Sequence, residues 1–193
     1  GHRLELGPQR VVDQPGIGQP GLVRAAQRVV VLAQLGVDQA LTFLREVDAI
    51  NMRRREKTVD LVRGSFGGSL LGHTVTVLGA AFKPNSDDVR DSPALSIAGS
   101  LSLAGASVSV YDPQAMENAK KNFPTLEYAP SIEAALEGSE MVVVATEWQQ
   151  FRDIDPVAAK KLVKRAAVLD GRNCLPTDQW RAAGWDVTCL GRG

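Results

Sequence analysis

The side chains best suited to chemistry lie in one charged stretch, residues 79–93, which reads GAAFKPNSDDVRDSP. Connections in folds of alternating strands and helices usually have about two to six residues, so a stretch of this length suggests binding. Lys83 and Arg90 can neutralise a phosphate or pyrophosphate. Asp87 and Asp88 can orient these cations or accept ribose hydroxyls. The alternative is a surface loop whose ion pairs satisfy one another.

A second candidate, Asp170-Gly171-Arg172, follows a short apolar run near the end of the sequence. Gly171 permits a tight turn that presents Arg172, whose guanidinium can bind phosphate through two hydrogen bonds or stack on a base. The alternative is that Arg172 pairs with Asp170 or with Glu147. Both candidate segments favour a phosphate-bearing ligand.

The glycine fingerprint of dinucleotide-binding folds, GxGxxG, is missing from the first stretch. Gly79 stands at a fingerprint position, but Phe82 is too large for the close backbone approach that the fingerprint provides. Asp112 stands where an acidic ribose ligand would be, although we favour a turn cap before Pro113. We likewise expect Trp148 to be a core residue rather than a stacking platform.

Composition excludes several classes of protein. The 193 residues carry 22 Lys plus Arg against 22 Asp plus Glu, so the neutral chain has no electrostatic reason to bind nucleic acid or anionic lipid. The longest apolar run, residues 29–33, is too short for a membrane helix. We therefore expect no nucleic-acid partner, no membrane and a cytoplasmic location.

The cysteine and histidine content predicts neither a metal site nor a catalytic triad. The cysteines are Cys174 and Cys189, and the histidines are His2 and His73. Two cysteines are too few for a disulfide framework or a four-ligand zinc site, and we expect both to be reduced and buried. A histidine-based site would have to use His73, which precedes a predicted strand.

From residue 73 onward, short apolar runs alternate with helical patterns. The predicted strands are residues 74–78, 108–111, 141–145, 167–169 and 185–190. The predicted helices are residues 94–104, 115–122, 131–137, 156–165 and 176–183. This alternation predicts an α/β fold, with a Rossmann-like parallel sheet and helices on both faces. Such sheets bind ligands beyond the carboxyl ends of their strands, where both candidate segments lie.

A long helix and an irregular segment precede this sheet. Apolar residues three or four apart predict a helix over residues 37–63. Its Arg53-Arg54-Arg55 run is interpreted as a solvated basic face, with a contact to a partner or an acidic ligand as the alternative. Residues 1–36 are rich in glycine and proline, which predicts irregular or poorly ordered structure. We therefore divide the chain into residues 1–36, a long-helix segment 37–68 and a Rossmann-like domain 69–193.

Four motifs, each at the carboxyl end of a predicted strand, resemble the UDP-glucose/GDP-mannose dehydrogenase family, and within it the UDP-glucose 6-dehydrogenases. They are GAAFKPNSDDVRDSP at 79–93, VYDP at 110–113, ATEWQQF at 145–151 and LDGRN at 169–173. The resemblance covers about residues 35–193, a linking helix followed by the domain that holds the UDP part of the substrate. It implies that the complete enzyme oxidises UDP-glucose to UDP-glucuronate with NAD.

The resemblance also implies roles for individual residues. Phe82 and Lys83 would contact the UDP-sugar, Arg172 the UDP moiety, and Arg90 the NAD that is held mainly by the other half of the enzyme. The linking helix implies a homodimer formed through residues 37–63. UDP or UDP-glucose is the expected ligand of this chain, and we do not expect NAD to bind to it alone.

Departures from the family predict a truncated and catalytically inactive chain. The complete family enzyme begins with a dinucleotide-binding Rossmann domain, and no such domain precedes residue 35 here; in the family register Pro20 takes the place of the catalytic cysteine. Proline cannot form the thiohemiacetal and thioester that the oxidation needs, so we predict no catalytic residue. The alternative is a dimerisation or assembly module without significant ligand binding.

Overall fold

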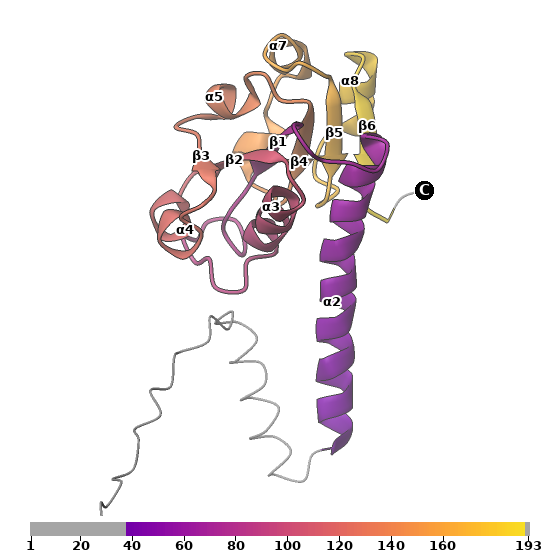
Figure 1. Cartoon of the computed structure of the whole chain (residues 1–193), viewed down its shortest axis with the longest axis vertical. Coiled ribbons are helices and arrows are strands. Elements are labelled where there is room, and N and C mark those ends of the chain that lie inside the picture. Colours follow the sequence, from indigo (N-terminus) through magenta and orange to yellow (C-terminus); the bar gives the residue numbers. More distant parts are fainter. Residues whose placement is uncertain (1–37, 192–193) are drawn as a thin grey trace, which may run out of the picture. The chain divides into compact units, whose positions relative to one another are not determined.

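The computed structural model describes residues 38–191, with side chains described from Leu41 onward (Figure 1). The predictions for residues 1–36, including the irregular segment and the position of Pro20, lie outside the described residues. Within the described range, strands and helices alternate as the sequence predicts.

The described elements fall into a long helix followed by a strand-and-helix domain. The strands are β1 Thr74–Leu78, β2 Ser107–Tyr111, β3 Glu127–Tyr128, β4 Met141–Val144, β5 Ala167–Asp170 and β6 Asp186–Cys189. The helices are α2 Asp38–Ser65, α3 Pro93–Leu103, α4 Met116–Asn122, α5 Ile132–Leu136, α6 Gln149–Arg152, α7 Pro156–Lys160 and α8 Thr177–Ala182.

The strands of the described residues form one parallel sheet in the order β3-β2-β1-β4-β5-β6. The order of connection reverses between β1 and β4. The register pairs Leu78 with Val144 and Val144 with Asp170, so the central strands end level with one another. This is the predicted Rossmann-like α/β fold, and the crevice at its reversal point is where such sheets bind ligands.

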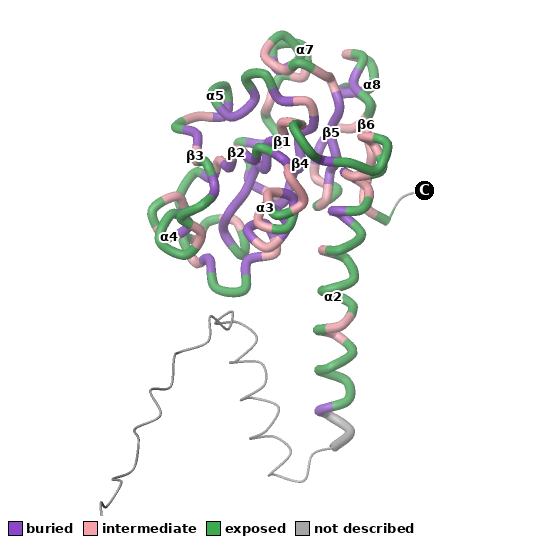
Figure 2. Tube along the Cα trace, viewed as in Figure 1, coloured by how far each residue is buried: buried purple, intermediate pink, exposed green. Residues whose placement is uncertain are grey.

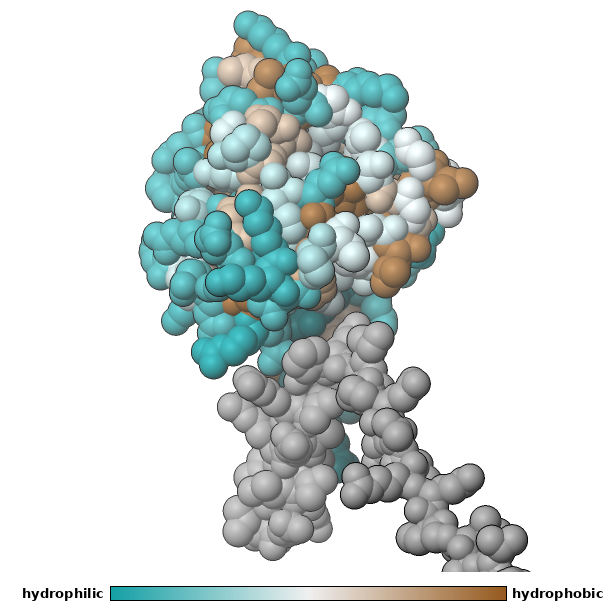
Figure 3. Space-filling model, turned by 60° about the vertical axis from the view of Figure 1, so that its left-hand side comes forward, coloured by the Kyte–Doolittle hydropathy of each residue, from teal (hydrophilic) through white to brown (hydrophobic). Residues whose placement is uncertain are grey.

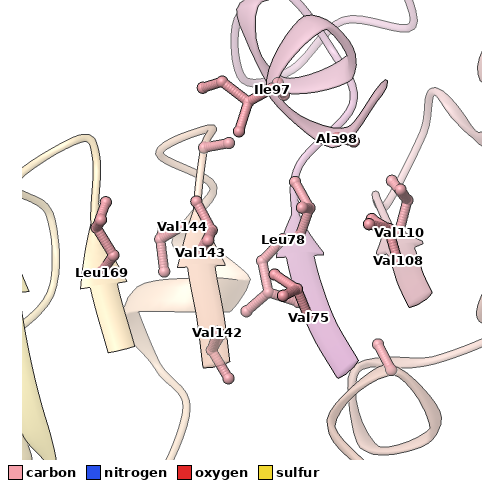
Figure 4. Packing of buried hydrophobic residues seen from close by; sticks show 14 of the residues in the cluster. Val75, Leu78, Ile97, Ala98, Val108, Val110, Val142, Val143, Val144 and Leu169 are labelled. Carbon is pink, nitrogen blue, oxygen red and sulfur yellow. The ribbon is translucent and has the colours of Figure 1, made fainter. Parts of the chain in front are cut away.

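Helices cover both faces of the sheet. Neighbouring side chains of a strand point to opposite faces, and every residue of β4 and β5 is buried. Figure 4 shows Val75 and Leu78 of β1 among the valines of β2 and β4, next to Ile97 and Ala98 of α3. On the face seen in Figure 3, hydrophilic residues predominate and apolar residues form small separate patches. The apolar strands therefore lie inside, as is typical of parallel sheets.

Local capping fixes where two helices begin. The side chain of Ser131, the N-cap of α5, accepts a hydrogen bond from the Ala134 N–H over 3.2 Å. At α3, the Ser92 side chain accepts from the Leu95 N–H over 3.2 Å, and Pro93 occupies the first turn. The second serine places the start of α3 directly after the charged stretch.

The structure differs from the predicted elements in three places. Strand β3 has two residues and α6 a single turn, so neither carries enough residues for a periodic pattern. Helix α7 ends at Lys160 instead of continuing to residue 165. It ends early because the Lys164 and Arg165 N–H groups donate to the Ser139 carbonyl, over 2.8 and 3.2 Å, ahead of β4.

The carboxyl-terminal turns of α2 belong to the core of this domain. Val59 and Val62 are buried in the same cluster as the sheet, and the Arg165 guanidinium donates to the Ser65 carbonyl over 3.0 Å. Earlier along the helix, the Arg55 guanidinium donates to the Asp91 carbonyl over 3.3 Å. Figure 2 shows that most of α2 before Thr58 is exposed.

Candidate functional site

The loops that follow β1 and β4 meet closely at the reversal point of the sheet. Gly79 adopts φ 117°, and a Cβ at this position would lie 2.4 Å from the Thr146 Oγ1. The Thr146 hydroxyl donates to the Ala81 carbonyl over 3.0 Å. Glycine is required at position 79 for both its conformation and this close approach. The meeting of the two loops fixes the base of the candidate site.

A buried carboxylate, Asp112, organises this edge of the sheet. One oxygen accepts from the N–H groups of Ala80 (2.8 Å) and Ala81 (3.0 Å) and from the Trp148 indole (3.0 Å). The other accepts from the N–H groups of the turn at residues 114–115, over 2.9 and 2.8 Å. The predicted turn cap and the predicted core position of Trp148 are both confirmed, since Asp112 is 1% and Trp148 6% exposed.

The charged stretch after β1 folds back on itself. The Phe82 N–H donates to the Asp88 carbonyl over 2.8 Å, which closes the loop. The Arg90 guanidinium donates two hydrogen bonds to the Asp88 carboxylate, from Nε over 2.9 Å and from Nη2 over 2.7 Å. This contact lowers the pKa of Asp88 to about 2 and raises the pKa of Arg90. Asp88 thus orients Arg90, one of the roles the sequence predicts for it.

The remaining predicted residues of this loop face solvent. Phe82 is 51% exposed, and Lys83 is exposed next to it. Asp87 does not pair with a cation. It accepts from the Asn118 amide, through its carbonyl at 2.9 Å and its carboxylate at 3.2 Å. Lys83 therefore remains available to a ligand.

Arg172 is held at the ends of β4 and β5. The buried Asp170 accepts from the N–H groups of Arg172 (3.0 Å) and Leu175 (2.8 Å), which shapes the turn. The Arg172 Nε donates to the Glu147 carboxylate over 2.5 Å. This hydrogen bond lowers the pKa of Glu147. Of the predicted alternatives, the ion pair with Glu147 is the one observed, while Asp170 serves the backbone.

A cleft of about 580 Å³ opens between the β1 and β4 loops. Its lining consists of Pro84, Asn85, Pro113, Glu147, Trp148, Gln149, Gln150, Arg152 and Asp153. Lys83 adjoins the cleft through its neighbour Pro84, and Arg172 through its partner Glu147. None of the four predicted site residues, Phe82, Lys83, Arg90 and Arg172, is itself among the lining residues. Sequence reasoning missed Arg152, because the single-turn helix α6 that carries it left no periodic signal.

The histidine and cysteines of the described residues take no part in this site. His73 lies at the opposite edge of the sheet, with its Nδ1 3.1 Å from the Glu140 carboxylate. Cys174 and Cys189 are free thiols, but both are half-buried instead of buried as expected. Partial burial nevertheless raises the pKa of Cys174 to about 11. Among residues 38–191, no group of three or more His, Cys, Asp or Glu could hold a metal ion, and no helix could cross a membrane.

Comparison with known proteins identifies the family. Residues 76–177 match the model of the UDP-glucose/GDP-mannose dehydrogenase family, UDP binding domain. The chain is 34% identical over 193 residues to the UDP-glucose 6-dehydrogenase YwqF of Bacillus subtilis, covering 100% of the chain and 43% of the relative. It is 35% identical over 179 residues to that of Rhizobium meliloti, covering 92% and 40%.

The solved structures agree with the sequence relatives. A UDP-glucose dehydrogenase from Pyrobaculum islandicum superimposes with a TM-score of 0.68 at 31% identity, covering 86% of this chain and 35% of that one. The chain therefore belongs to the UDP-glucose/GDP-mannose dehydrogenase family, and residues 76–177 form its UDP-binding domain. It spans about two fifths of the length of the curated relatives. The alignment with YwqF covers the whole chain, so the relationship extends before residue 35, where our motifs gave no signal.

Proposed function

We propose that this chain binds UDP or UDP-glucose at the carboxyl edge of its sheet, as the UDP-binding part of a UDP-glucose 6-dehydrogenase. One observation carries the proposal: the cleft is lined by Pro84, the chain neighbour of Lys83, and by Glu147, the ion-pair partner of Arg172, in a domain that matches the family's UDP binding domain. The cleft volume of about 580 Å³ is within the usual range for small-ligand sites.

Arg172 and Lys83 are the proposed ligands of the diphosphate. The Arg172 side chain is about one-third exposed, and its carboxylate partner Glu147 lies at the cleft wall. A diphosphate offers the guanidinium the same bidentate partner as a carboxylate, with more charge. We propose that Phe82 packs against the sugar, since its ring is 51% exposed among the described residues.

Arg90 is proposed to reach NAD that another domain holds. The chain itself fits a dinucleotide poorly, because the N–H groups of Ala80 and Ala81, which the fingerprint loop would offer to a pyrophosphate, are already bonded to Asp112. We propose that NAD does not bind to this chain alone, and that the 193-residue chain does not oxidise UDP-glucose. The two free thiols support a cytoplasmic location as part of the same proposal.

Calorimetric titration of the chain with UDP, UDP-glucose and NAD tests the binding proposal. UDP and UDP-glucose should bind, and NAD should bind weakly or not at all. The variant Arg172→Ala should lose about tenfold or more in UDP affinity, because it removes a charged hydrogen-bond donor. Arg181→Ala is the matched control, since Arg181 is an exposed arginine on α8 that pairs with Asp178. Equal UDP affinity in the two variants would remove Arg172 from the site.

A second candidate function is assembly through α2, proposed as a homodimer formed by residues 37–63 of the linking segment 37–68. The supporting observation is that Leu44 and Met52 on α2 are more than 40% exposed. Light scattering over a concentration series tests it, and a monomeric mass at every concentration would count against it. Production of NADH from UDP-glucose and NAD by the pure chain would disprove the proposed inactivity.

A further inference from the structure

A second cavity lies between α2 and the end of β6, away from the cleft described above. Its volume is about 560 Å³. Residues Ile50, Arg53, Arg54, Lys57 and Leu61 line it from α2, and Thr188, Cys189, Leu190 and Gly191 from the end of β6. The α2 residues recur at intervals of three and four, so they form one face of the helix. Figure 1 shows β6 next to the carboxyl-terminal end of α2. We call this cavity the α2–β6 groove.

Positive charge in the groove is only partly balanced by the protein. Arg53 has a carboxylate partner, Glu46, at 3.9 Å. Further along the helix, Asp60 is paired with Arg63 at 2.8 Å. Within residues 41–191, Arg54 and Lys57 have no ion pair and no side-chain hydrogen bond. Like charges three and four residues apart on a helix repel one another, so an anion bound between them would relieve that repulsion.

The groove also has apolar walls. Ile50 is 42% exposed although it faces the groove, and Leu61 and Leu190 are only partly buried. Exposed apolar side chains beside two neighbouring cations suit a ligand with an anionic end and a flat apolar body. A volume of about 560 Å³ admits a small molecule of that kind.

We propose that the α2–β6 groove binds a small organic phosphate of the nucleoside monophosphate class. The phosphate lies between the Arg54 guanidinium and the Lys57 ammonium group, and the base packs against Ile50 and Leu190. The proposal is independent of UDP-sugar binding, because none of the groove residues belongs to the cleft that borders Lys83 and Arg172.

Backbone contacts join the groove to the loop that carries Arg172. The Leu190 N–H donates to the Asp170 carbonyl over 3.1 Å, and the Asn173 amide donates to the Leu190 carbonyl over 3.0 Å. A ligand that contacts Leu190 therefore touches a residue that is hydrogen-bonded to that loop. The test includes Arg172→Ala to separate the two sites, because this variant should weaken UDP binding but leave the groove intact.

Binding of AMP to the 193-residue chain tests the proposal. Calorimetric titration should show AMP binding more tightly than inorganic phosphate, and adenosine, which lacks the anion, should not bind. The double variant Arg54→Gln/Lys57→Gln should weaken AMP binding by about tenfold or more, since it removes two charged donors. The control Lys120→Gln/Lys121→Gln removes the same charge from exposed positions on α4 and should bind AMP as the unmodified chain does.

Alkylation of Cys189 gives a second readout that needs no change in the groove. In the variant Cys174→Ser, Cys189 is the remaining cysteine of the sequence, and it lines the groove. AMP should slow its alkylation, while adenosine should not. The proposal is overturned by any of three results: no AMP binding, adenosine or inorganic phosphate binding as tightly as AMP, or alkylation of Cys189 at an unchanged rate under saturating AMP. Arg172→Ala should leave the AMP result unchanged, so failure here and failure at the UDP site are distinguishable.

Discussion

At each end of the parallel strands, one acidic side chain accepts several hydrogen bonds, but the donors at the two ends differ. At the carboxyl edge, Asp112 accepts five hydrogen bonds from backbone and indole N–H groups, and among the described residues no cation contacts it. At the amino edge, Glu140 accepts from the Thr74 N–H at 3.1 Å, the His73 ring at 3.1 Å and the Lys164 ammonium group at 2.8 Å.

The two acids therefore have different roles: Asp112 holds loops in place, and Glu140 neutralises a positive charge. At the amino end of the strands, Glu140 pairs with the Lys164 ammonium group and also contacts the His73 ring. Phe66 stacks on His73 there, with ring centroids 4.2 Å apart. Asp112 uses its charge on backbone groups, so the cations of the carboxyl edge remain at the surface. The carboxyl end of the sheet, where a buried acid holds the loops, is where we propose that Lys83 and Arg172 bind the ligand.

The largest expected effect comes from removing the carboxylate at the carboxyl edge. Asp112→Ala should lower the free energy of unfolding by about 4 kcal/mol, because several buried N–H groups lose their acceptor together. Urea unfolding followed by tryptophan fluorescence measures it. The control is Asp178→Ala, at a fully exposed side chain, which should change stability by less than about 0.5 kcal/mol. Similar losses in the two variants would contradict the role given to Asp112.

A smaller loss is expected where the β1 and β4 loops touch. Gly79→Ala should cost about 2–3 kcal/mol, since its φ of 117° is strained for alanine and the new Cβ would meet Thr146 at 2.4 Å. Gly64→Ala, on α2 with open space around it, is the matched control and should be neutral or slightly stabilising. Thermal unfolding of both variants gives the comparison, and equal melting temperatures would refute it.

Removing one donor from Asp112 tests how the carboxylate is shared. Trp148→Phe keeps most of the buried ring and deletes the indole N–H, which donates over 3.0 Å. The free energy of unfolding should fall by about 1.5 kcal/mol, as for the loss of a single hydrogen bond to a charged group. In the background of Asp112→Ala, the same substitution should cost clearly less. Additive losses in the double variant would show that the two side chains do not interact.

The smallest effect is expected at the amino edge, and it should depend on pH. The Lys164 ammonium group, with Thr74 and His73, lowers the pKa of Glu140 from 4.5 to about 2. The stability that this carboxylate adds is therefore present above pH 4.5 and lost as the pH falls towards 2. Glu140→Gln should cost about 0.5–1 kcal/mol at neutral pH.

The pH series itself decides this last prediction. The gap in unfolding free energy between Glu140→Gln and the unmodified chain should close between pH 4.5 and about pH 2. Glu137→Gln, at an exposed acid on the same side of β4, should leave the pH dependence unchanged. A gap that stays constant with pH would mean that the ion pairs at this edge add nothing.

Local sequence patterns were sufficient to predict the strands and the parallel sheet, but not the side-chain contacts between distant segments. The β-branched run at residues 74–78 predicts β1 with its observed bounds, because a buried parallel strand needs little beyond its own composition. The level ends of β1, β4 and β5 follow from the parallel sheet, which is why motifs far apart in sequence predict one edge.

The partners of individual side chains depend on distances that a sequence does not contain. The turn cap at Asp112 is visible locally, whereas its bonds to Ala80, Ala81 and Trp148 arise only when three strand ends come together. The α2–β6 groove is similar, since the sequence marks the arginine run but not the strand end that faces it. The roles of Phe82, Lys83, Arg90 and Arg172 in ligand binding stay predictions.

In the loop after β1, Asp112 accepts from the backbone N–H groups that could otherwise bind a phosphate, and this affects how the ligand preference of the domain can evolve. A glycine-rich loop recognises phosphate through backbone amides, which a point mutation in a gene rarely alters without breaking the loop. Here Asp112 takes those amides, so recognition is left to side chains on the surrounding loops. We propose that ligand preference in such a domain changes through single codon changes at exposed positions such as Lys83, while the buried Asp112 keeps the loop beneath unchanged.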